Sequence, residues 1–490
     1  MEGVWGNREV SPADSASLSP PMDLERLVTA LGPLEVRGGA PTDVTDLAYD
    51  ARAVVPGALF FCVPGQRADG HDFAAEAVER GAAVLVVERP LDLPVPQLVV
   101  GSARAAMPVA ADEFFERPTE ELLLTGITGT TGKTTTTFVL WSIFDAAGMQ
   151  PGLIGTIESR VGGQARPAVR TTPEAIDLQR TFRAMLDAGD RSCVMEATSH
   201  GSELGRLERS RFRALAFTNL SQDHLDFHES MERYFEAKRR LFTEHEPAPA
   251  AAVNVGDEWG RRLADELRRL DRAPVLTYGT AADAELTTHP ALEQSRLVGS
   301  FNIENVLAAA ALSRLLGVPD EAVVEGVAAV SGVPGRFETV DEGQPFTVIV
   351  DYSHKPGALE AVLHTARELT RGRLICVFGA GGDRDRGKRP QMGRVASELA
   401  DLAIVTSDNP RTEDPIAIID EILAGVVGPA EVEPDRRAAI AMAIGEARAG
   451  DVVVIAGRGA EQYQDVAGRK LPFDDREVAR EELRRLRAPA

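Results

Sequence analysis

Apolar residues recur along the chain in two alternating patterns. Short, continuous apolar runs such as residues 122–128, 193–197 and 214–217 are typical of buried strands, whereas residues 133–147 and 301–318 carry apolar side chains at helical spacing. Strands that alternate with helices in this way predict parallel sheets with helices on both faces. The pattern therefore predicts an α/β protein.

The chain of 490 residues is too long for one hydrophobic core, so several domains are expected. The pattern predicts a small N-terminal α/β domain over residues 1–117, which begins with a Ser, Pro and Gly-rich segment up to about Pro21. A central parallel sheet is expected over residues 118–337, and a doubly wound, Rossmann-like C-terminal sheet over residues 338–490. Residues 332–338, G-V-P-G-R-F-E, interrupt the periodicity and are expected to form a hinge.

The clearest chemical signal lies between a predicted strand and a predicted helix, in the sequence G-T-T-G-K-T-T of residues 129–135. Gly129 and Gly132 let backbone N–H groups approach an anion at the positive end of the helix. Lys133 would then reach the outer phosphates of a nucleotide, and Thr134 would offer a hydroxyl to Mg²⁺. The loop therefore predicts a magnesium-dependent nucleotide site.

An ordinary glycine turn followed by an exposed lysine is the alternative interpretation of this loop. Four consecutive threonines, Thr134–Thr137, begin the following helix, although threonine is a poor helix former. Their presence favours a function over a plain turn. The loop is a shortened variant of the general pattern, because Ile127 stands where the first glycine is usual.

Two further apolar runs end in polar residues that the topology places at the same sheet edge. Glu196 and His224 follow predicted parallel strands, at whose carboxyl ends ligands of open α/β sheets bind. Both are candidate ligands of the metal ion that Thr134 would contact. A neighbouring arginine that neutralises Glu196 is the alternative interpretation. Zinc is also left open by a cluster of two histidines and two acids, although oxygen ligands beside a phosphate favour Mg²⁺. The cluster consists of His224, His228, Asp223 and Asp226.

Other polar positions carry weaker signals. The loop of residues 65–71 follows a strand and is either a plain surface connection or a ligand-facing loop. Lys238 taken alone is expected to be an ordinary surface lysine. Asn302 and Asn305 are expected in the first turn of a helix.

Polar motifs also follow the strands of the last third of the chain. They are Asp351–His354, G-A-G-G-D-R-D-R-G-K, D-N-P-R and G-R-G-A-E. Arg384 and Arg411 in these motifs suit a carboxylate-bearing ligand, because guanidinium groups bind carboxylates with two hydrogen bonds. Surface ion pairs are an equally good interpretation of both arginines. G-A-G-G-D-R lacks the last glycine of the dinucleotide fingerprint, and no G-x-S-x-G hydrolase motif occurs.

Composition and charge exclude several classes of function. With 44% hydrophobic and 26% charged residues the chain is typical of globular proteins, and its net charge of −22 argues against binding to nucleic acid or anionic membranes. Cys62, Cys193 and Cys376 lie apart in apolar runs and are expected to be buried thiols in a reducing compartment. No apolar run is long enough to cross a bilayer, and the first twenty residues do not form a signal peptide, so a cytoplasmic protein is expected.

With these motifs in place, the chain resembles the Mur ligase family from about Thr45 to Arg476. The shortened T-G-T-T-G-K-T-T loop and D-N-P-R occur in the family's order among many spaced motifs. The resemblance implies a P-loop ATPase-like central domain and an amide ligase of peptidoglycan precursor synthesis that uses ATP and Mg²⁺. D-N-P-R accompanies diaminopimelate in the family. The implied reaction therefore adds diaminopimelate, expected as the meso isomer, to UDP-N-acetylmuramoyl-L-Ala-D-Glu through an acyl phosphate.

The resemblance also implies roles for individual residues, position by position. Implied ATP-binding residues are Gly129, Thr130, Thr131, Gly132, Lys133, Thr134, Thr135, Asn302, Asn305, Arg336 and Asp351. Implied residues for the UDP-muramoyl dipeptide are Tyr49, Ala51, Gln66, Arg67, Ala68, Thr171, Thr172, Thr198 and Arg206. Implied residues for diaminopimelate are Arg384, Asp408, Asn409, Pro410, Arg411, Gly457 and Glu461.

Catalytic roles are implied for Lys133, Glu196, His224, Lys238 and His354, of which His354 would orient a phosphate. The implied metal ligands are Thr134, Glu196, His224 and Lys238. Lys238 matches a lysine that is carbamylated in the family, a reaction that needs a neutral amine and hence a depressed lysine pKa. A carbamate would turn this cation into an anion beside the metal.

The chain departs from the family pattern at four positions. Ala51 replaces a usual Ser, Leu204 a Gln, Arg458 a Lys and Ala460 a His, which leaves open details of nucleotide-sugar binding and the identity of the amino acid. L-lysine or another diamino acid, a folylpolyglutamate-synthetase-like ligase and a nonenzymatic nucleotide-binding module remain alternatives. We expect a monomer that binds these small molecules, without nucleic-acid binding or membrane insertion.

Overall fold

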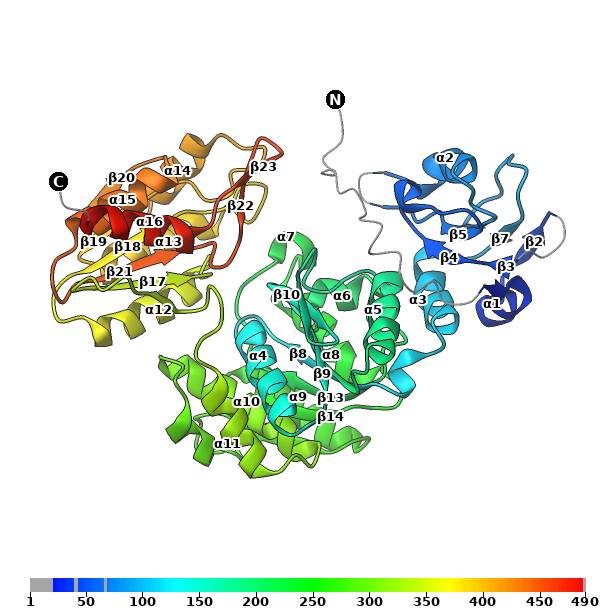
Figure 1. Cartoon of the computed structure of the whole chain (residues 1–490), viewed down its shortest axis with the longest axis horizontal. Helices are drawn as coiled ribbons and strands as arrows, with labels where there is room; N and C mark the ends of the chain where they lie inside the picture. The colour runs from blue at the N-terminus through cyan, green and yellow to red at the C-terminus, as the bar shows by residue number, and fades with distance from the viewer. Residues whose placement is uncertain (1–20, 39–42, 66–67, 488–490) are drawn as a thin grey trace.

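The computed structural model describes residues 21–38, 43–65 and 68–487, which fold around three large sheets (Figure 1). Each large sheet is the centre of one α/β domain, as the periodicity predicts. Within the described residues, no helix is both long enough and apolar enough to cross a membrane.

The first sheet has five strands in the order β2-β7-β6-β5-β4, parallel from β4 to β7 with β2 antiparallel at one edge. The strands are β2 (Glu35–Arg37), β4 (Asp46–Ala48), β5 (Ala58–Phe61), β6 (Val84–Val87) and β7 (Gln97–Val99), and β1 (Met22–Asp23) pairs with β3 (Asp43–Val44) beside them. Helices α1 (Leu24–Leu31) and α3 (Ala103–Phe114) cover one face, and α2 (Ala74–Glu79) covers the other.

The second sheet has eight strands in the order β11-β10-β9-β12-β8-β13-β14-β15. They are β8 (Leu123–Thr128), β9 (Pro151–Ile154), β10 (Glu158–Val161), β11 (Gln164–Pro167), β12 (Ser192–Glu196), β13 (Phe212–Phe217), β14 (Ala250–Asn254) and β15 (Val275–Tyr278). The six strands β9, β12, β8, β13, β14 and β15 are parallel, whereas β10 and β11 are antiparallel and form the predicted glycine-bearing hairpin. Because β12 and β13 flank β8, the residues after these three strands meet at one edge.

Helices cover both faces of this second sheet. One face is covered by α4 (Lys133–Ala146), α10 (Ser300–Leu315) and α11 (Asp320–Ala329). The other is covered by α5 (Ala175–Asp187), α8 (Met231–Thr243) and α9 (Glu258–Leu270), while the short helices α6 (Ser199–Glu203) and α7 (Leu225–His228) follow β12 and β13. Asn305 lies in the second turn of α10, one turn later than predicted.

The third sheet has six strands in the order β16-β17-β21-β18-β19-β20. They are β16 (Glu338–Val340), β17 (Thr347–Asp351), β18 (Leu374–Phe378), β19 (Leu402–Val405), β20 (Ala430–Val432) and β21 (Val452–Ala456). One face packs against α12 (Pro356–Leu369), α13 (Lys388–Leu399) and α14 (Pro415–Leu423), and the other against α15 (Arg436–Glu446) and α16 (Asp475–Arg487).

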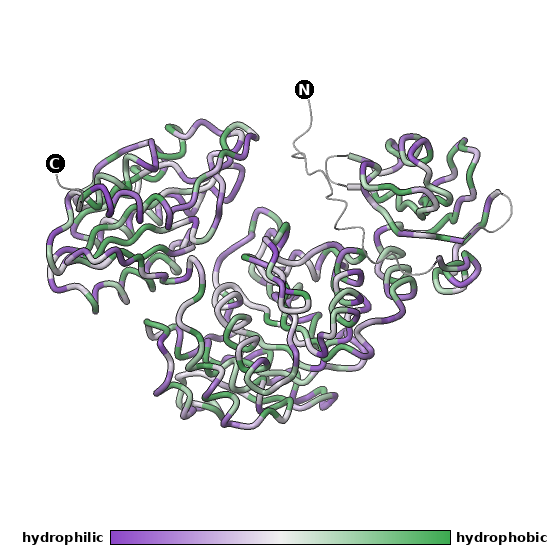
Figure 2. Tube along the Cα trace, in the orientation of Figure 1, coloured by the Kyte–Doolittle hydropathy of each residue, from purple (hydrophilic) through white to green (hydrophobic). Residues whose placement is uncertain are grey.

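The third sheet differs from the predicted parallel sheet in two places. The edge strand β16 is antiparallel to β17, and a hairpin of β22 (Tyr463–Val466) and β23 (Arg469–Pro472) follows β21. Both segments are short and mostly polar, so neither gives the apolar run that identifies a buried strand. Figure 2 shows apolar colour along the central strands, whereas the helices around them carry both apolar and polar colour.

Candidate functional site

The loop between β8 and α4 has the backbone geometry that glycine allows. Gly129 has φ 144° and Gly132 has φ 84°, and a Cβ at Gly129 would lie 1.8 Å from Thr218 Oγ1. Asn219, which follows β13, braces the loop by accepting hydrogen bonds from the Thr130 N–H at its carbonyl (2.9 Å) and from the Thr131 N–H at its side chain (3.0 Å). No motif in the sequence marks Asn219 as part of the site.

The threonines that follow the loop lie in the first turn of α4 and are buried. Thr134 Oγ1 accepts a hydrogen bond from Arg336 Nη2 at 3.0 Å, so the hinge before the third sheet touches the phosphate loop. Thr136 Oγ1 donates to Asn305 Oδ1 at 3.3 Å, and Asn305 Nδ2 donates to Asn302 Oδ1 at 2.8 Å. The structure thus brings Arg336 and both asparagines to the loop, where sequence matching places them.

Two lysines converge on one carbonyl of the phosphate loop. Lys133 Nζ donates to the Gly129 carbonyl at 2.9 Å and to the Thr130 carbonyl at 3.0 Å, and Lys238 Nζ donates to the Gly129 carbonyl at 2.8 Å. Lys238 is only 1% exposed, so the prediction of an ordinary surface lysine is wrong. The packing of α8 beneath the loop buries it.

Burial and neighbouring cations favour the neutral form of these amines. Burial, followed by the charge of Lys355, lowers the pKa of Lys133 to about 8. Burial, followed by the charges of Lys133 and Lys355, holds the pKa of Lys238 well below its ordinary value. Lys238 Nζ also lies 4.5 Å from the centroid of the Tyr234 ring.

Glu196 ends β12 and His224 follows β13, so the two residues lie on the two sides of the phosphate loop. Glu196 is 1% exposed, and its two carboxylate oxygens accept hydrogen bonds from the Thr156 N–H (2.7 Å) and the Thr156 hydroxyl (3.0 Å). The partner of Glu196 is therefore a threonine, not the arginine of the alternative interpretation. His224 has φ 53°, and its Nε2 lies 2.8 Å from Asp223 Oδ2.

The donor types at this edge fit Mg²⁺ better than zinc. Thr134 offers a hydroxyl, Glu196 a carboxylate and His224 an imidazole, and oxygen donors are the ligands that Mg²⁺ prefers. Across the residues that the structure describes, no group of three or more His, Cys, Asp and Glu side chains is placed to hold a metal ion by itself.

The threonines matched to the muramoyl dipeptide lie next to Glu196. Thr172 Oγ1 donates to the Glu196 carbonyl at 2.8 Å and lies 3.0 Å from Thr198 Oγ1. Thr171 Oγ1 lies 3.1 Å from Thr156 Oγ1, on the other side of the same carboxylate. Arg206 Nη1 donates to the Thr172 carbonyl at 3.2 Å.

Three arginines surround the buried Glu174 beside these threonines. The carboxylate lies 2.8 Å from Arg206, 2.9 Å from Arg170 and 3.3 Å from Arg104, which comes from α3 of the first domain. Three guanidinium groups therefore gather around one buried carboxylate at the junction of the first two domains. The sequence analysis missed Arg104 and Arg170, because no motif marks them.

Among the described residues matched to the nucleotide sugar, Tyr49 makes a hydrogen bond to the second domain. Tyr49 OH donates to Asp177 Oδ2 of α5 at 2.6 Å, which joins the first domain to the second. Ala51 is 5% exposed and Ala68 is exposed. Gln66 and Arg67, which were also matched to the nucleotide sugar, lie outside the described residues.

A second polar cluster lies beyond the carboxyl ends of β17, β19 and β21. Glu461 accepts hydrogen bonds from Asn409 Nδ2 (2.8 Å) and Tyr352 OH (3.3 Å). Burial, followed by the charge of Asp408, raises the pKa of Glu461. A Cβ on Gly457 would lie 2.5 Å from Asp408 Oδ2, so this glycine is needed for the close approach.

The arginines of the third domain flank this cluster. Arg411 has φ 52°, and its Nη1 donates to the Gly382 carbonyl at 2.5 Å. Arg384 is exposed. Burial lowers the pKa of His200 in the second domain to about 3, with smaller contributions from the charges of two neighbouring histidines and of Arg384. Pro410 lies between Asn409 and Arg411 in the loop after β19. The guanidinium of Arg458 is fully buried and lies 3.9 Å from Glu461.

Asp351 ends β17 and His354 follows it, at the junction of the second and third sheets. Asp351 accepts hydrogen bonds from the N–H groups of Phe337 and Ser353, each at 2.7 Å, and so braces the hinge. His354 Nδ1 lies 2.8 Å from the Tyr352 carbonyl. Burial, followed by the charge of Lys388, holds the pKa of His354 well below its ordinary value.

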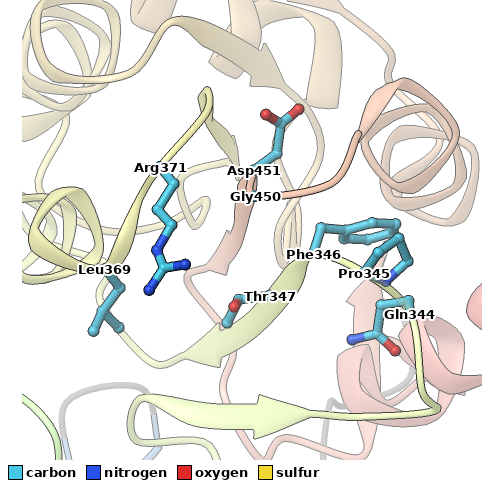
Figure 3. Close-up of a pocket in the computed structure, with 8 residues that line it drawn as sticks. All are labelled: Gln344, Pro345, Phe346, Thr347, Leu369, Arg371, Gly450 and Asp451. Atoms are coloured by element: carbon cyan, nitrogen blue, oxygen red, sulfur yellow. The ribbon is translucent and has the colours of Figure 1, made fainter.

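A separate hollow lies at the opposite, amino end of the third sheet (Figure 3). It is lined by Gln344, Pro345, Phe346, Thr347, Leu369, Arg371, Gly450 and Asp451. Ligands of open parallel sheets bind at the carboxyl ends of the strands, and none of the matched site residues lines this hollow. We therefore do not assign it to the site.

Comparison with known proteins identifies three matching family models. The model of the Mur ligase family, catalytic domain, matches residues 43–114. The Mur ligase middle domain matches residues 127–313, and the Mur ligase, glutamate ligase domain matches residues 335–459. The matches follow the order of the three large sheets.

Curated relatives match nearly the whole chain. The chain is 46% identical over 470 residues to the UDP-N-acetylmuramoyl-L-alanyl-D-glutamate--2,6-diaminopimelate ligase of Solibacter usitatus, a match that covers 91% of this chain and 94% of that protein. The enzyme of the same name from Geobacillus kaustophilus is 45% identical over 485 residues, with 94% and 99% covered. A solved structure with this enzyme name is 30% identical with a TM-score of 0.63, covering 94% of this chain and 99% of that one.

Proposed function

The chain belongs to the Mur ligase family, and from this membership we propose that it is the ATP-dependent ligase that adds 2,6-diaminopimelate to UDP-N-acetylmuramoyl-L-alanyl-D-glutamate. The observation that carries the proposal is the meeting of two sheet edges. Lys355, which follows β17, lies 2.5 Å from Asp223, which follows β13, and Arg336 reaches Thr134 of the phosphate loop. A phosphorylated substrate and an amine held by different domains could therefore meet there.

The proposed reaction has two steps. The terminal carboxylate of the dipeptide attacks the γ-phosphorus of ATP, the bond to the bridging oxygen breaks, and an acyl phosphate and ADP form. The neutral amine of diaminopimelate then attacks the acyl carbon, the resulting tetrahedral intermediate expels phosphate, and the amine loses a proton to leave an amide. Lys133 at the phosphate loop would stabilise the charge on the transferred group.

Mg²⁺ belongs to the proposal as the metal held by Thr134, Glu196, His224 and a carbamylated Lys238. When bound, it would neutralise charge on the nucleotide phosphates. The burial of Lys238 supports carbamylation, because its lowered pKa supplies the neutral amine that reacts with CO₂. The N–C bond that forms leaves a carbamate, which adds an oxygen donor and removes one of the two cations at the Gly129 carbonyl.

The substrate pockets follow from charge. The positive cluster of Arg104, Arg170 and Arg206 suits the anionic UDP-muramoyl dipeptide, with Thr171, Thr172 and Thr198 beside it. Glu461 and Asn409 suit the ammonium and carboxylate groups at the end of the amino acid that lies away from the attacking amine. Arg384 and Arg411 would bind its second carboxylate, which lysine does not have. His354 would orient the phosphate.

Phosphate release and the mass of the product test this function directly. The enzyme is supplied with ATP, Mg²⁺, the UDP-muramoyl dipeptide and one of meso-diaminopimelate, LL-diaminopimelate, lysine or ornithine. We expect the meso isomer to give the tripeptide product fastest. Equal rates with lysine would contradict the role of Arg411, and no product with any amine would contradict the ligase function.

A second reaction mixture tests the alternative ligase. Turnover of folate with glutamate would support the folylpolyglutamate-synthetase-like function, whereas binding of ATP without any product would support a nonenzymatic module. The proposal includes a monomer that acts in the cytoplasm, and sedimentation of the active enzyme tests the oligomeric state.

A further inference from the structure

Tyr352 links the predicted amino-acid pocket to the body of the third sheet. It follows β17, is partly buried, and donates from its hydroxyl to Glu461 Oε1 at 3.3 Å. The other oxygen of Glu461 accepts from Asn409 Nδ2 at 2.8 Å. The two hydrogen bonds together fix the plane of the Glu461 carboxylate.

The ring of Tyr352 contacts Arg336, which in turn reaches the residue after Lys133 of the phosphate loop. The guanidinium carbon of Arg336 lies 4.2 Å from the centroid of the Tyr352 ring, a cation–π contact. The same arginine donates to Thr134 Oγ1 at 3.0 Å. A continuous set of contacts therefore runs from Thr134 through Arg336 and Tyr352 to Glu461.

The backbone around this set of contacts is closely packed. A Cβ on Gly335, beside Arg336, would lie 2.1 Å from the Ala460 nitrogen, and a Cβ on Gly459 would lie 2.9 Å from Tyr352 Cβ. The hinge and the loop that carries Glu461 thus lie in direct contact. A shift of one displaces the other, because packed interiors leave no free space between them.

The hydroxyl of Tyr352 keeps its proton and can always donate a hydrogen bond to Glu461. Burial, followed by the charge of Glu461, raises the pKa of Tyr352 well above its ordinary value, so the phenol stays protonated over the whole working range of pH. Glu461 therefore faces a fixed donor and not a competing anion.

We propose that Tyr352 is a positioning residue that holds Glu461 in place for the amino acid and couples that pocket, through Arg336, to the phosphate loop. This inference rests on the proposed ligase function. It predicts that the ring and the hydroxyl have separable roles: the hydroxyl positions Glu461, and the ring positions Arg336.

The test compares Tyr352→Phe, Tyr352→Leu and the matched control Tyr463→Phe, whose ring contacts Lys470 and not Glu461. Steady-state kinetics give KM for diaminopimelate and for ATP, together with kcat. Tyr352→Phe keeps the ring, so we expect KM for diaminopimelate to rise roughly three- to tenfold while KM for ATP stays within about twofold. Tyr352→Leu should raise both KM values, and the control should change neither.

A double variant separates positioning from a general loss of structure. In the Glu461→Gln background, Tyr352→Phe should add less than about twofold to KM for diaminopimelate, because the two residues act through one contact. Effects that multiply, or an unchanged KM for diaminopimelate in Tyr352→Phe, would overturn the positioning role. An unchanged KM for ATP in Tyr352→Leu would overturn the coupling to the phosphate loop.

Wild-type turnover keeps this test separate from the proposed function. If the wild-type enzyme adds lysine instead of diaminopimelate, the proposed amino acid is wrong, and the same variants are compared with lysine. If Tyr352→Leu does not fold, Tyr352→Phe and the double variant still decide the positioning role.

Discussion

Lys355 Nζ lies 2.5 Å from Asp223 Oδ2, and this ion pair joins the third domain to the second. Both side chains are about nine-tenths buried, with exposed fractions of 11% and 10%. Burial opposes ionisation of Asp223, but the charge of Lys355 and the hydrogen bond to His224 outweigh it and hold the pKa of Asp223 well below its ordinary value. The pair therefore stabilises the approach of the two domains beside the phosphate loop.

The first prediction concerns this ion pair. Lys355→Met should open the arrangement of the domains and reduce turnover, because removing one partner of a buried pair costs about 3–5 kcal/mol. Lys355→Met with Asp223→Asn should recover part of the loss, since no buried charge is left unpaired. Small-angle scattering and turnover measure the effect. Equal scattering and equal turnover for the single and double variants would contradict the role of the pair.

The second prediction concerns Lys238. Lys238→Ala should reduce kcat by about a hundredfold and raise the Mg²⁺ concentration needed for half-maximal rate, because a proposed oxygen donor is lost. Acetate should restore part of the activity, whereas Lys238→Arg, which keeps a cation at the Gly129 carbonyl, should stay inactive. The exposed Lys470→Ala is the control. Full activity of Lys238→Arg would show that no carbamate is needed.

The third prediction concerns the arginine cluster between the first two domains. Arg104→Ala should raise KM for the UDP-muramoyl dipeptide on the order of fivefold, because one of three cations around Glu174 is removed at a site that is partly exposed. KM for ATP should not change. Arg37→Ala, which removes an exposed arginine that lies 2.8 Å from the exposed Glu35, is the matched control. A similar rise in both variants would mean that net charge alone is responsible.

The fourth prediction concerns pH and Glu461. Its raised pKa means that the carboxylate takes up a proton at a higher pH than an ordinary glutamate, so it loses its charge earlier as the pH falls. The groups that face it are Asp408, Asn409, Arg411, Arg458 and Tyr352. We therefore expect kcat/KM for diaminopimelate to decline on the acid side with an apparent pKa above that of an ordinary glutamate.

Two comparisons complete the pH test. Glu461→Gln carries no titrating group at this position and should lose the acid-side decline in kcat/KM for diaminopimelate. The profile for ATP should lack this step in both proteins. An identical acid limb in wild type and Glu461→Gln would assign the titration to another group.

The sequence predicts the framework of the fold well because apolar runs such as residues 122–128 mark buried parallel strands directly. The carboxyl ends of parallel strands share one edge, so the convergence of Glu196 and His224 on the phosphate loop also follows from the sequence. Short edge elements such as β16 escape this reasoning, because three mostly polar residues give no periodic signal.

Residues that act through packing between distant segments were harder to predict. Lys238 stands among charged residues in the sequence, and only the position of α8 beneath Gly129 buries it. No motif marks Arg104, and Asp223, which the sequence places in a cluster of acids and histidines, has its lysine partner in another domain. The resemblance to a family predicts a role for Lys238. The roles of Arg104 and Tyr352 can be inferred only from the contacts that the three-dimensional structure shows.

The fate of one oxygen atom tests the central claim most directly. The terminal carboxylate of the UDP-muramoyl dipeptide is labelled with heavy oxygen, and the phosphate released during turnover with ATP, Mg²⁺ and meso-diaminopimelate is analysed by mass spectrometry. An acyl phosphate predicts that each phosphate released with the tripeptide product carries one labelled oxygen. Unlabelled phosphate, released at the same rate as the tripeptide forms, would contradict the account.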